Sequence, residues 1–209
     1  MNKLLKRFPA FVLPIVLLGC GAMSPIRVLD PNSPAMQING FKVIPPQRAG
    51  WQFSGTDSLV GFYRLLRLPE ARGGPENEPQ TFVITVETLR AASDDISTVD
   101  GLIRYTGRFS SAVSPERRQR LVEHKLSAYR DQETDCVRFN ALVEEQPRKS
   151  LLEIRGAGFV CRHPLSPDHV VRGMYSERHA AGEQNQSSEP DVREAENVLK
   201  SVEFMHLRH

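Results

Sequence analysis

Two cysteines lie where sulfur chemistry is feasible, and the chain allows two kinds of it. Cys136 and Cys161 are 25 residues apart in the sequence, and a disulfide between them would add roughly 3 kcal/mol of stability in the chain-entropy model. The alternative is a nucleophilic thiol at Cys161 assisted by His163, which shares its face of an extended strand. A disulfide needs an oxidising compartment, whereas a nucleophile needs a reduced thiol. The compartment therefore decides between them.

A second group of polar residues follows a strongly apolar segment near the C-terminus. Tyr175, Glu177 and Arg178 come after this predicted strand and before a Gly/Gln/Asn/Ser-rich stretch at 182–188. Binding residues often lie where a rigid sheet passes into a loop. Glu177 and Arg178 could present opposite charges to a partner, with Tyr175 supplying contact area. The alternative is a core tyrosine beside a structural salt bridge or turn.

Other candidate motifs point to structural roles. Glu144 and Glu145 are adjacent on a predicted strand and so face opposite ways, which does not suit paired acid/base work. Gly156-Ala157-Gly158 lies inside a predicted strand, which indicates close packing of backbones. The six histidines contain no pair at i and i+4, and we expect no metal and no cofactor. A basic run at 117–120 lacks interleaved aromatics, so we expect no nucleic-acid partner.

The N-terminus carries the features of a secretory signal. Residues 1–7 hold three positive charges and no acidic residue, and an apolar run follows at 8–18. This run is shorter than the roughly 20 residues that a membrane-spanning helix needs. It ends in Leu17-Leu18-Gly19-Cys20, which resembles the lipobox of bacterial lipoproteins. The resemblance implies that the Cys20 sulfur is acylated, that residues 1–19 are removed, and that the protein is a lipid-anchored envelope protein.

An anchored protein facing the periplasm would have its remaining cysteines in an oxidising compartment. That location favours a Cys136–Cys161 disulfide over a thiol nucleophile. Gly21, directly after Cys20, favours the outer membrane over the inner membrane.

Composition and patterning predict a single domain behind a linker. Removing residues 1–19 takes three of the 27 basic residues and no acidic one, which leaves 24 basic and 25 acidic residues. This balance gives no general attraction to an anionic surface. Residues 20–38 show no apolar period after Cys20, and we expect a flexible tether there; fifteen such residues could span about 50 Å. We expect residues 39–209 to form one globular domain.

Apolar spacing predicts an α+β fold. We expect an amphipathic helix over residues 94–112, capped by Ser93 or Asp94, and a second over 190–202. The remaining alternating or apolar runs predict strands at 59–68, 81–89, 126–130, 136–143, 151–161, 170–175 and 202–204. Cys136 near the start of one strand and Cys161 near the end of the next would be neighbours in an antiparallel pair.

The order of these elements resembles the PsbP/Mog1 family. The resemblance rests on Gly40-Phe41-x-Val43-x-Pro45 with Trp51, on Tyr175-Ser176-Glu177-Arg178, and on the closing Leu199-Lys200-Ser201-Val202-Glu203-Phe204. It covers residues 40–205 and implies an α/β/α sandwich around an antiparallel sheet. It implies no inherited active site.

Two functions are consistent with the sequence. The first is a non-enzymatic envelope lipoprotein that binds a protein partner or helps to assemble one in the periplasm. The second is an envelope hydrolase or small-ligand-binding lipoprotein with a polar pocket near Tyr175 to Arg178. A cleft with convergent polar groups would favour the second, and an exposed apolar patch would favour the first.

Overall fold

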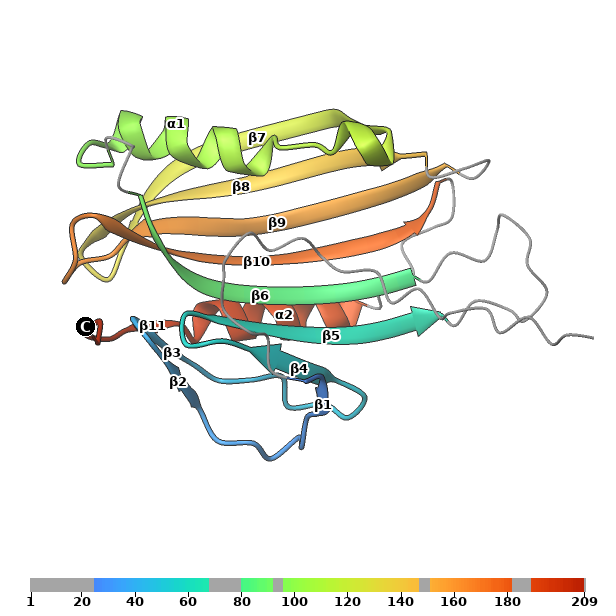
Figure 1. Ribbon diagram of the computed structural model, residues 1–209, viewed down its shortest axis with the longest axis horizontal. Helices are drawn as coiled ribbons and strands as arrows, with labels where there is room; N and C mark the ends of the chain where they lie inside the picture. The colour runs from blue at the N-terminus through green and yellow to red at the C-terminus, as the bar shows by residue number, and fades with distance from the viewer. Residues whose placement is uncertain (1–24, 68–79, 92–95, 147–150, 182–188, 209) are drawn as a thin grey trace, which may run out of the picture.

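The computed structural model describes residues 25–67, 80–91, 96–146, 151–181 and 189–208. Its centre is one eight-stranded antiparallel sheet with the strand order β1-β4-β5-β6-β10-β9-β8-β7 (Figure 1). The strands are β1 (Arg27–Val28), β4 (Gln52–Gly55), β5 (Leu59–Arg67), β6 (Gln80–Arg90), β7 (Gln119–Asp131), β8 (Thr134–Glu145), β9 (Leu152–Arg162) and β10 (His169–Ala180). A small sheet of order β11-β3-β2 accompanies it, formed by β2 (Met36–Ile38), β3 (Phe41–Val43) and β11 (Glu203–Phe204).

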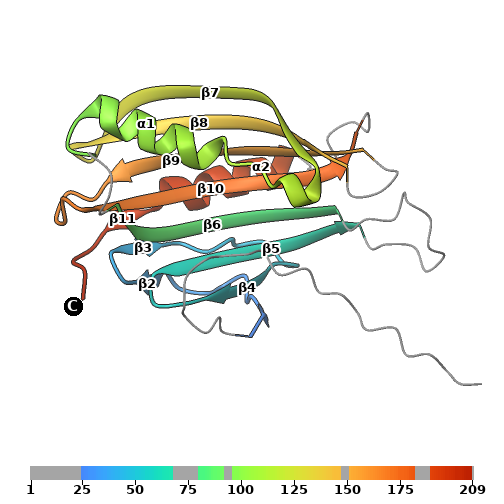
Figure 2. The same cartoon turned by 45° about the horizontal axis from the view of Figure 1, so that its top comes forward.

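The two α-helices lie on opposite faces of the large sheet (Figures 1 and 2). Helix α1 (Val99–Ser110) packs on β7, β8 and β9, and α2 (Glu189–Lys200) packs on β10 and the core beside it. We call these two sides of the sheet the α1 face and the α2 face. Neither helix, nor the short 3₁₀ helix at Pro115–Arg117, is long and apolar enough to cross a bilayer in the described part of the chain.

Each face has its own hydrophobic core because side chains alternate along each strand. The α2-face core includes Trp51, Phe62 and Phe82 with Ala195 and Val198 of α2. The α1-face core gathers under α1; its buried members are Ala91, Ile96, Leu102, Val137, Phe139, Val160 and Val170. The structure therefore confirms the predicted α+β class, an antiparallel sheet with a helix on either side.

A buried ion network fixes α2 on its face. The carboxylate of Asp191 accepts hydrogen bonds from the guanidinium groups of Arg48 and Arg64, at 2.7 and 2.8 Å. The carboxylate of Glu194 accepts from the Arg48 backbone N–H at 2.8 Å and from the Trp51 indole N–H at 3.1 Å. These bonds satisfy two acidic side chains that are almost fully buried. The helix is thereby held in one position relative to β4 and β5.

The predicted strands are confirmed, and several are longer than their patterns. The helix predicted from residue 94 is α1, but it begins at Val99 instead. The Thr98 side chain caps it by accepting a hydrogen bond from the Gly101 N–H at 3.1 Å. Ser93 and Asp94, the expected caps, lie outside the described residues.

The tether predicted over residues 20–38 is wrong for residues 25–38. Leu29 is only 2% exposed and packs in the α2-face core, and its backbone N–H donates to the Trp51 carbonyl at 2.9 Å. Residues of β1 pair with β4, and Met36 and Ile38 pack against the same core. Strands of two or three residues are too short to show a hydrophobic period, so the sequence pattern could not reveal them. The folded part includes residues 25–38.

Candidate functional site

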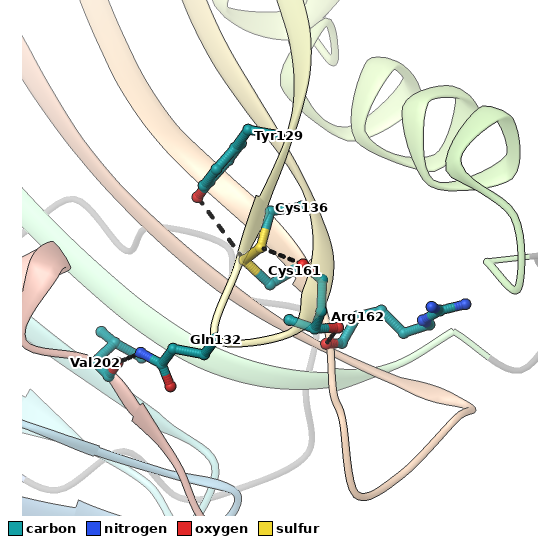
Figure 3. Close-up of a disulfide and its surroundings, with 7 residues drawn as sticks. Tyr129, Gln132, Cys136, Cys161, Arg162 and Val202 are labelled. Atoms are coloured by element: carbon teal, nitrogen blue, oxygen red, sulfur yellow. Dashed lines mark hydrogen bonds between the residues drawn. A yellow bond between two sulfur atoms is a disulfide. The ribbon is translucent and has the colours of Figure 1, made fainter.

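The predicted disulfide is present, and it excludes a thiol nucleophile at Cys161. Cys136 of β8 and Cys161 of β9 lie directly opposite each other in the antiparallel pair, and their sulfurs are bonded (Figure 3). Both residues lie on the α2 face and are almost completely buried. The cysteine spacing and the predicted antiparallel strand pair both indicated this bond. The physical reason is that residues directly opposite each other in a strand pair have their side chains on the same side of the sheet.

His163, the other half of the nucleophile hypothesis, has a structural role. Its Nδ1 accepts the Leu165 backbone N–H at 3.1 Å, which assigns the ring proton to Nε2. Nε2 then donates to the carbonyls of Gly40 and Met205, both at 3.0 Å. Burial lowers the pKa of His163 and keeps the ring neutral. The side chain thus ties the end of β9 to the small sheet and the C-terminal segment.

The three polar residues after the predicted apolar strand do not lie at a strand end. Strand β10 continues to Ala180 and pairs with β6 through Arg178 and with β9 through Ala180. Tyr175 and Glu177 point to the α2 face, where Glu177 is only 3% exposed. Arg178 points to the α1 face, where Nη2 of its guanidinium lies 3.3 Å from Oε1 of the buried Glu145. The structure therefore brings Tyr175 and Glu177 together and separates Arg178 from them.

Tyr175 and Glu177 belong to a groove on the α2 face, beside α2. Helix α2 covers the middle of this face and leaves the outer strands β7, β8 and β9 open beyond it. Two hollows of about 340 and 550 Å³ lie there, and they adjoin each other, since both are lined by Asn140, Ala157 and Tyr175. We call this combined depression the α2 groove.

The floor of the α2 groove is polar and aromatic. Tyr129 and Arg138 come from β7 and β8, and the Arg138 guanidinium lies 4.9 Å from the centre of the Tyr129 ring. Tyr175 stacks on Phe82 beneath it, with ring centres 5.6 Å apart. Asn140 lines both hollows and lies level with Tyr175, two strands away in the sheet. The floor thus offers a guanidinium, an amide and two phenols, spread from β7 to β10.

One end of the groove is closed by the turn between β7 and β8. The Gln132 side chain donates to the Val202 carbonyl at 3.0 Å, just after the end of α2 (Figure 3). This hydrogen bond joins the edge of the large sheet to the segment that leads into the small one. Arg138 and Tyr129 lie close to this junction, so the shape of that end depends on it.

The electrostatics of the groove keep both phenols protonated. Burial raises the pKa of Tyr129 to about 12, with Asp131 adding to the effect and Arg138 opposing it. Burial also raises the pKa of Tyr175, helped by the nearby carboxylates of Glu196 and Glu177. At neutral pH each hydroxyl can therefore both donate and accept a hydrogen bond. Such a set can recognise amide and carboxylate groups.

Sequence reasoning reached part of this site. It found Tyr175 and Glu177 but not Tyr129, Arg138 or Asn140. A signal for the last two was present, because Cys136, Arg138 and Asn140 alternate along one strand and must share a face. What the sequence lacked was the position of α2, which decides where that face stays open.

The other motifs have the structural roles expected of them. A Cβ added to Gly158 would lie 2.2 Å from the Gly173 carbonyl oxygen, so this glycine permits close approach of β9 and β10. Glu144 and Glu145 face opposite ways, and Glu144 pairs with the exposed Arg120. Among the described residues, no group of three or more His, Cys, Asp or Glu side chains could hold a metal ion.

Comparisons with known proteins give only distant likenesses. No family model matches the chain, and no curated protein matches it. Among solved structures, LpqN of Mycobacterium tuberculosis, described as involved in cell envelope biogenesis, aligns with 13% identity and a TM-score of 0.39 over 88% of this chain and 92% of LpqN. The immunity protein TplEi of the T6SS from Pseudomonas aeruginosa aligns with 10% identity and a TM-score of 0.29, over 88% of this chain and 54% of TplEi. Likenesses at this level carry no functional argument.

Proposed function

We propose that this protein is a non-enzymatic lipoprotein of the bacterial envelope that binds a protein partner through the α2 groove. Acylated Cys20, in a segment outside the described residues, would hold it to the membrane with the domain facing the periplasm. The Cys136–Cys161 disulfide supports this location, because such bonds persist in oxidising compartments. The favoured membrane is the outer one, on the strength of Gly21.

The hydrogen-bonding and aromatic side chains that line the α2 groove are the observation that carries the partner hypothesis. A polypeptide presents amide donors and acceptors along its length, and the phenols of Tyr129 and Tyr175 with the amide of Asn140 can pair with them. Aromatic rings and arginine are also the side chains enriched at protein interfaces. Glu196 and Lys200 of α2 line the same hollow and form an ion pair with each other at 3.3 Å, so the two together add no net charge to that side of the groove.

A small polar ligand is the second candidate, and one observation favours it. Tyr175 and Glu177 both line the larger hollow, so a hydroxyl and a carboxylate converge there. Native mass spectrometry of gently purified protein separates the two candidates. A retained small molecule would favour the ligand reading, and a retained polypeptide would favour the partner reading.

Replacing Cys20 by alanine should block acylation and release or mislocalise the protein. The acyl anchor stabilises membrane binding by about 0.8 kcal/mol per buried methylene, and the variant lacks it. Fractionation of cells should find wild type with the proposed membrane and the variant in a different fraction. Labelled palmitate should enter wild type only; wild type without label would refute the lipobox interpretation.

A photo-crosslinking residue placed at Asn140 should capture a partner in living cells. The same residue at Val99 is the matched control, since Val99 begins α1 on the opposite face and is 38% exposed. Adding Arg138→Ala should reduce the yield from position 140, because it removes the charged group on the groove floor. Equal capture from both positions, or a yield insensitive to Arg138, would count against the groove as the binding site.

A further inference from the structure

The folded position of β1 leaves very little chain between the domain and the expected lipid. Five peptide units separate Cys20 from Pro25, the first described residue, and they reach at most about 18 Å. The headgroup layer takes up roughly 6 Å of that span. The remaining ~12 Å is less than the radius of gyration of about 15 Å for a domain of this size. An anchored domain therefore has the edge of its sheet at β1 close to the bilayer.

That edge carries exposed apolar side chains on one face. Ile26 and Val28 are 56% and 79% exposed, and Leu65 of β5 is 49% exposed. Val28 lies opposite Gln52, Gln52 opposite Tyr63, and Tyr63 is two residues from Leu65 on the same strand. Val28 and Leu65 therefore share the α1 face of the sheet, at the end that α1 does not cover, and the exposed Ile26 directly precedes β1. We call them the β1-edge patch.

We infer that the β1-edge patch docks onto the bilayer that holds the Cys20 lipid. This inference rests on the proposed lipid anchor. The short connection brings the patch to the membrane, and inserting apolar side chains among the headgroups removes them from water. No other described part of the domain is as near to Cys20 along the chain.

Docking in this way also directs the α2 groove away from the membrane. Strands β7 to β10 and strand β1 lie at opposite ends of the sheet (Figure 1). The groove lies over β7 to β10 on the α2 face, whereas the patch lies at the β1 end on the α1 face. The two surfaces are thus at opposite ends and on opposite sides of one rigid sheet. A partner could reach the groove while the patch remains against the lipid.

Fluorescent labels on the full-length acylated protein test the docking. Val28→Cys and Leu65→Cys would each carry an environment-sensitive thiol probe, in vesicles of phosphatidylethanolamine and phosphatidylglycerol. Val122→Cys is the matched control, because Val122 is 45% exposed but lies on β7, at the other end of the sheet. We expect a blue shift and loss of iodide quenching at positions 28 and 65, relative to the same labels on Cys20→Ala protein in buffer. Position 122 should show neither.

Two further measurements make each outcome decisive. The mass of the N-terminal peptide reports whether Cys20 is acylated. Suppose that Cys20 is acylated and that the probes at 28 and 65 stay as accessible to iodide as the probe at 122. This result would overturn the docking and leave the lipoprotein proposal intact. An unmodified Cys20 would overturn both.

The second measurement uses a probe at Ile26→Cys. Its blue shift should disappear when Val28→Glu and Leu65→Glu are added, and a shift that persists in that variant would also overturn the docking.

Discussion

Glu145→Gln should lower the free energy of unfolding by about 3 kcal/mol, since removing one partner of a buried ion pair leaves the other charge poorly compensated. Glu145 is 2% exposed, and its carboxylate lies 3.3 Å from the Arg178 guanidinium. It also accepts a hydrogen bond from the Gln119 side chain at 3.4 Å. Urea denaturation at neutral pH, followed by circular dichroism, measures the change.

The neighbouring glutamate is the matched control for this variant. Glu144 pairs with Arg120, whose side chain is 71% exposed, so the pair is screened by water. Glu144→Gln should therefore change the free energy of unfolding by no more than about 1 kcal/mol. If both substitutions had the same effect, burial of the Glu145–Arg178 pair would not be what stabilises the protein.

Removing the disulfide should lower the free energy of unfolding by a similar amount. The effect acts on the unfolded state. The double variant Cys136→Ala with Cys161→Ala should lose roughly 3 kcal/mol, because the unfolded state is no longer restricted by a closed loop. Such a loss is a large share of the 5 to 15 kcal/mol by which domains are stable. Denaturant midpoints of wild type and variant, each with and without a thiol reductant, give the comparison.

The reductant separates the bond from the side chains. It should lower the midpoint of wild type and leave the double variant unchanged. If the reductant lowered the midpoint equally in both proteins, its effect would not come from the Cys136–Cys161 disulfide.

The sequence predicted the fold well where segments were long. Strands β5, β6, β8, β9 and β10 each have nine residues or more, and their alternation or apolar content is visible in the sequence. Strand β7 is as long, but only residues 126–130 of it were predicted, because its first half is charged and mostly exposed. The short strands β1 and β2 lacked that signal, and Leu29 enters the core without any periodic neighbour. The predicted strand at 170–175 ends too early, because the polar residues Glu177 and Arg178 are typical of a solvated strand end. The burial of Glu177 and the ion pair between Arg178 and Glu145 depend on the tertiary structure, which the local sequence does not specify.

The candidate site was predicted in part for a related reason. Strand periodicity is enough to place Tyr175 and Glu177 on one face and Arg178 on the other, once β10 is known to continue. It does not say that α2 stops short of β7 to β9, since this depends on where Asp191 and Glu194 find Arg48 and Trp51. The PsbP/Mog1 resemblance stays a prediction, as do the anchor at Cys20 and the partner.

The place of β10 in the sheet has a consequence for the order in which the sheet can form during synthesis. The strand order joins two consecutive sets, β1-β4-β5-β6 and β7 to β10, through the single β6–β10 contact. Residues paired across that contact are about ninety positions apart, so β6 waits with one unpaired side while the chain up to Ala180 emerges. At synthesis rates of roughly 5 to 20 residues per second, this interval is about 5 to 20 s. An open strand edge is prone to pair with other chains, so the growing chain is most exposed to aggregation in the seconds before β10 arrives.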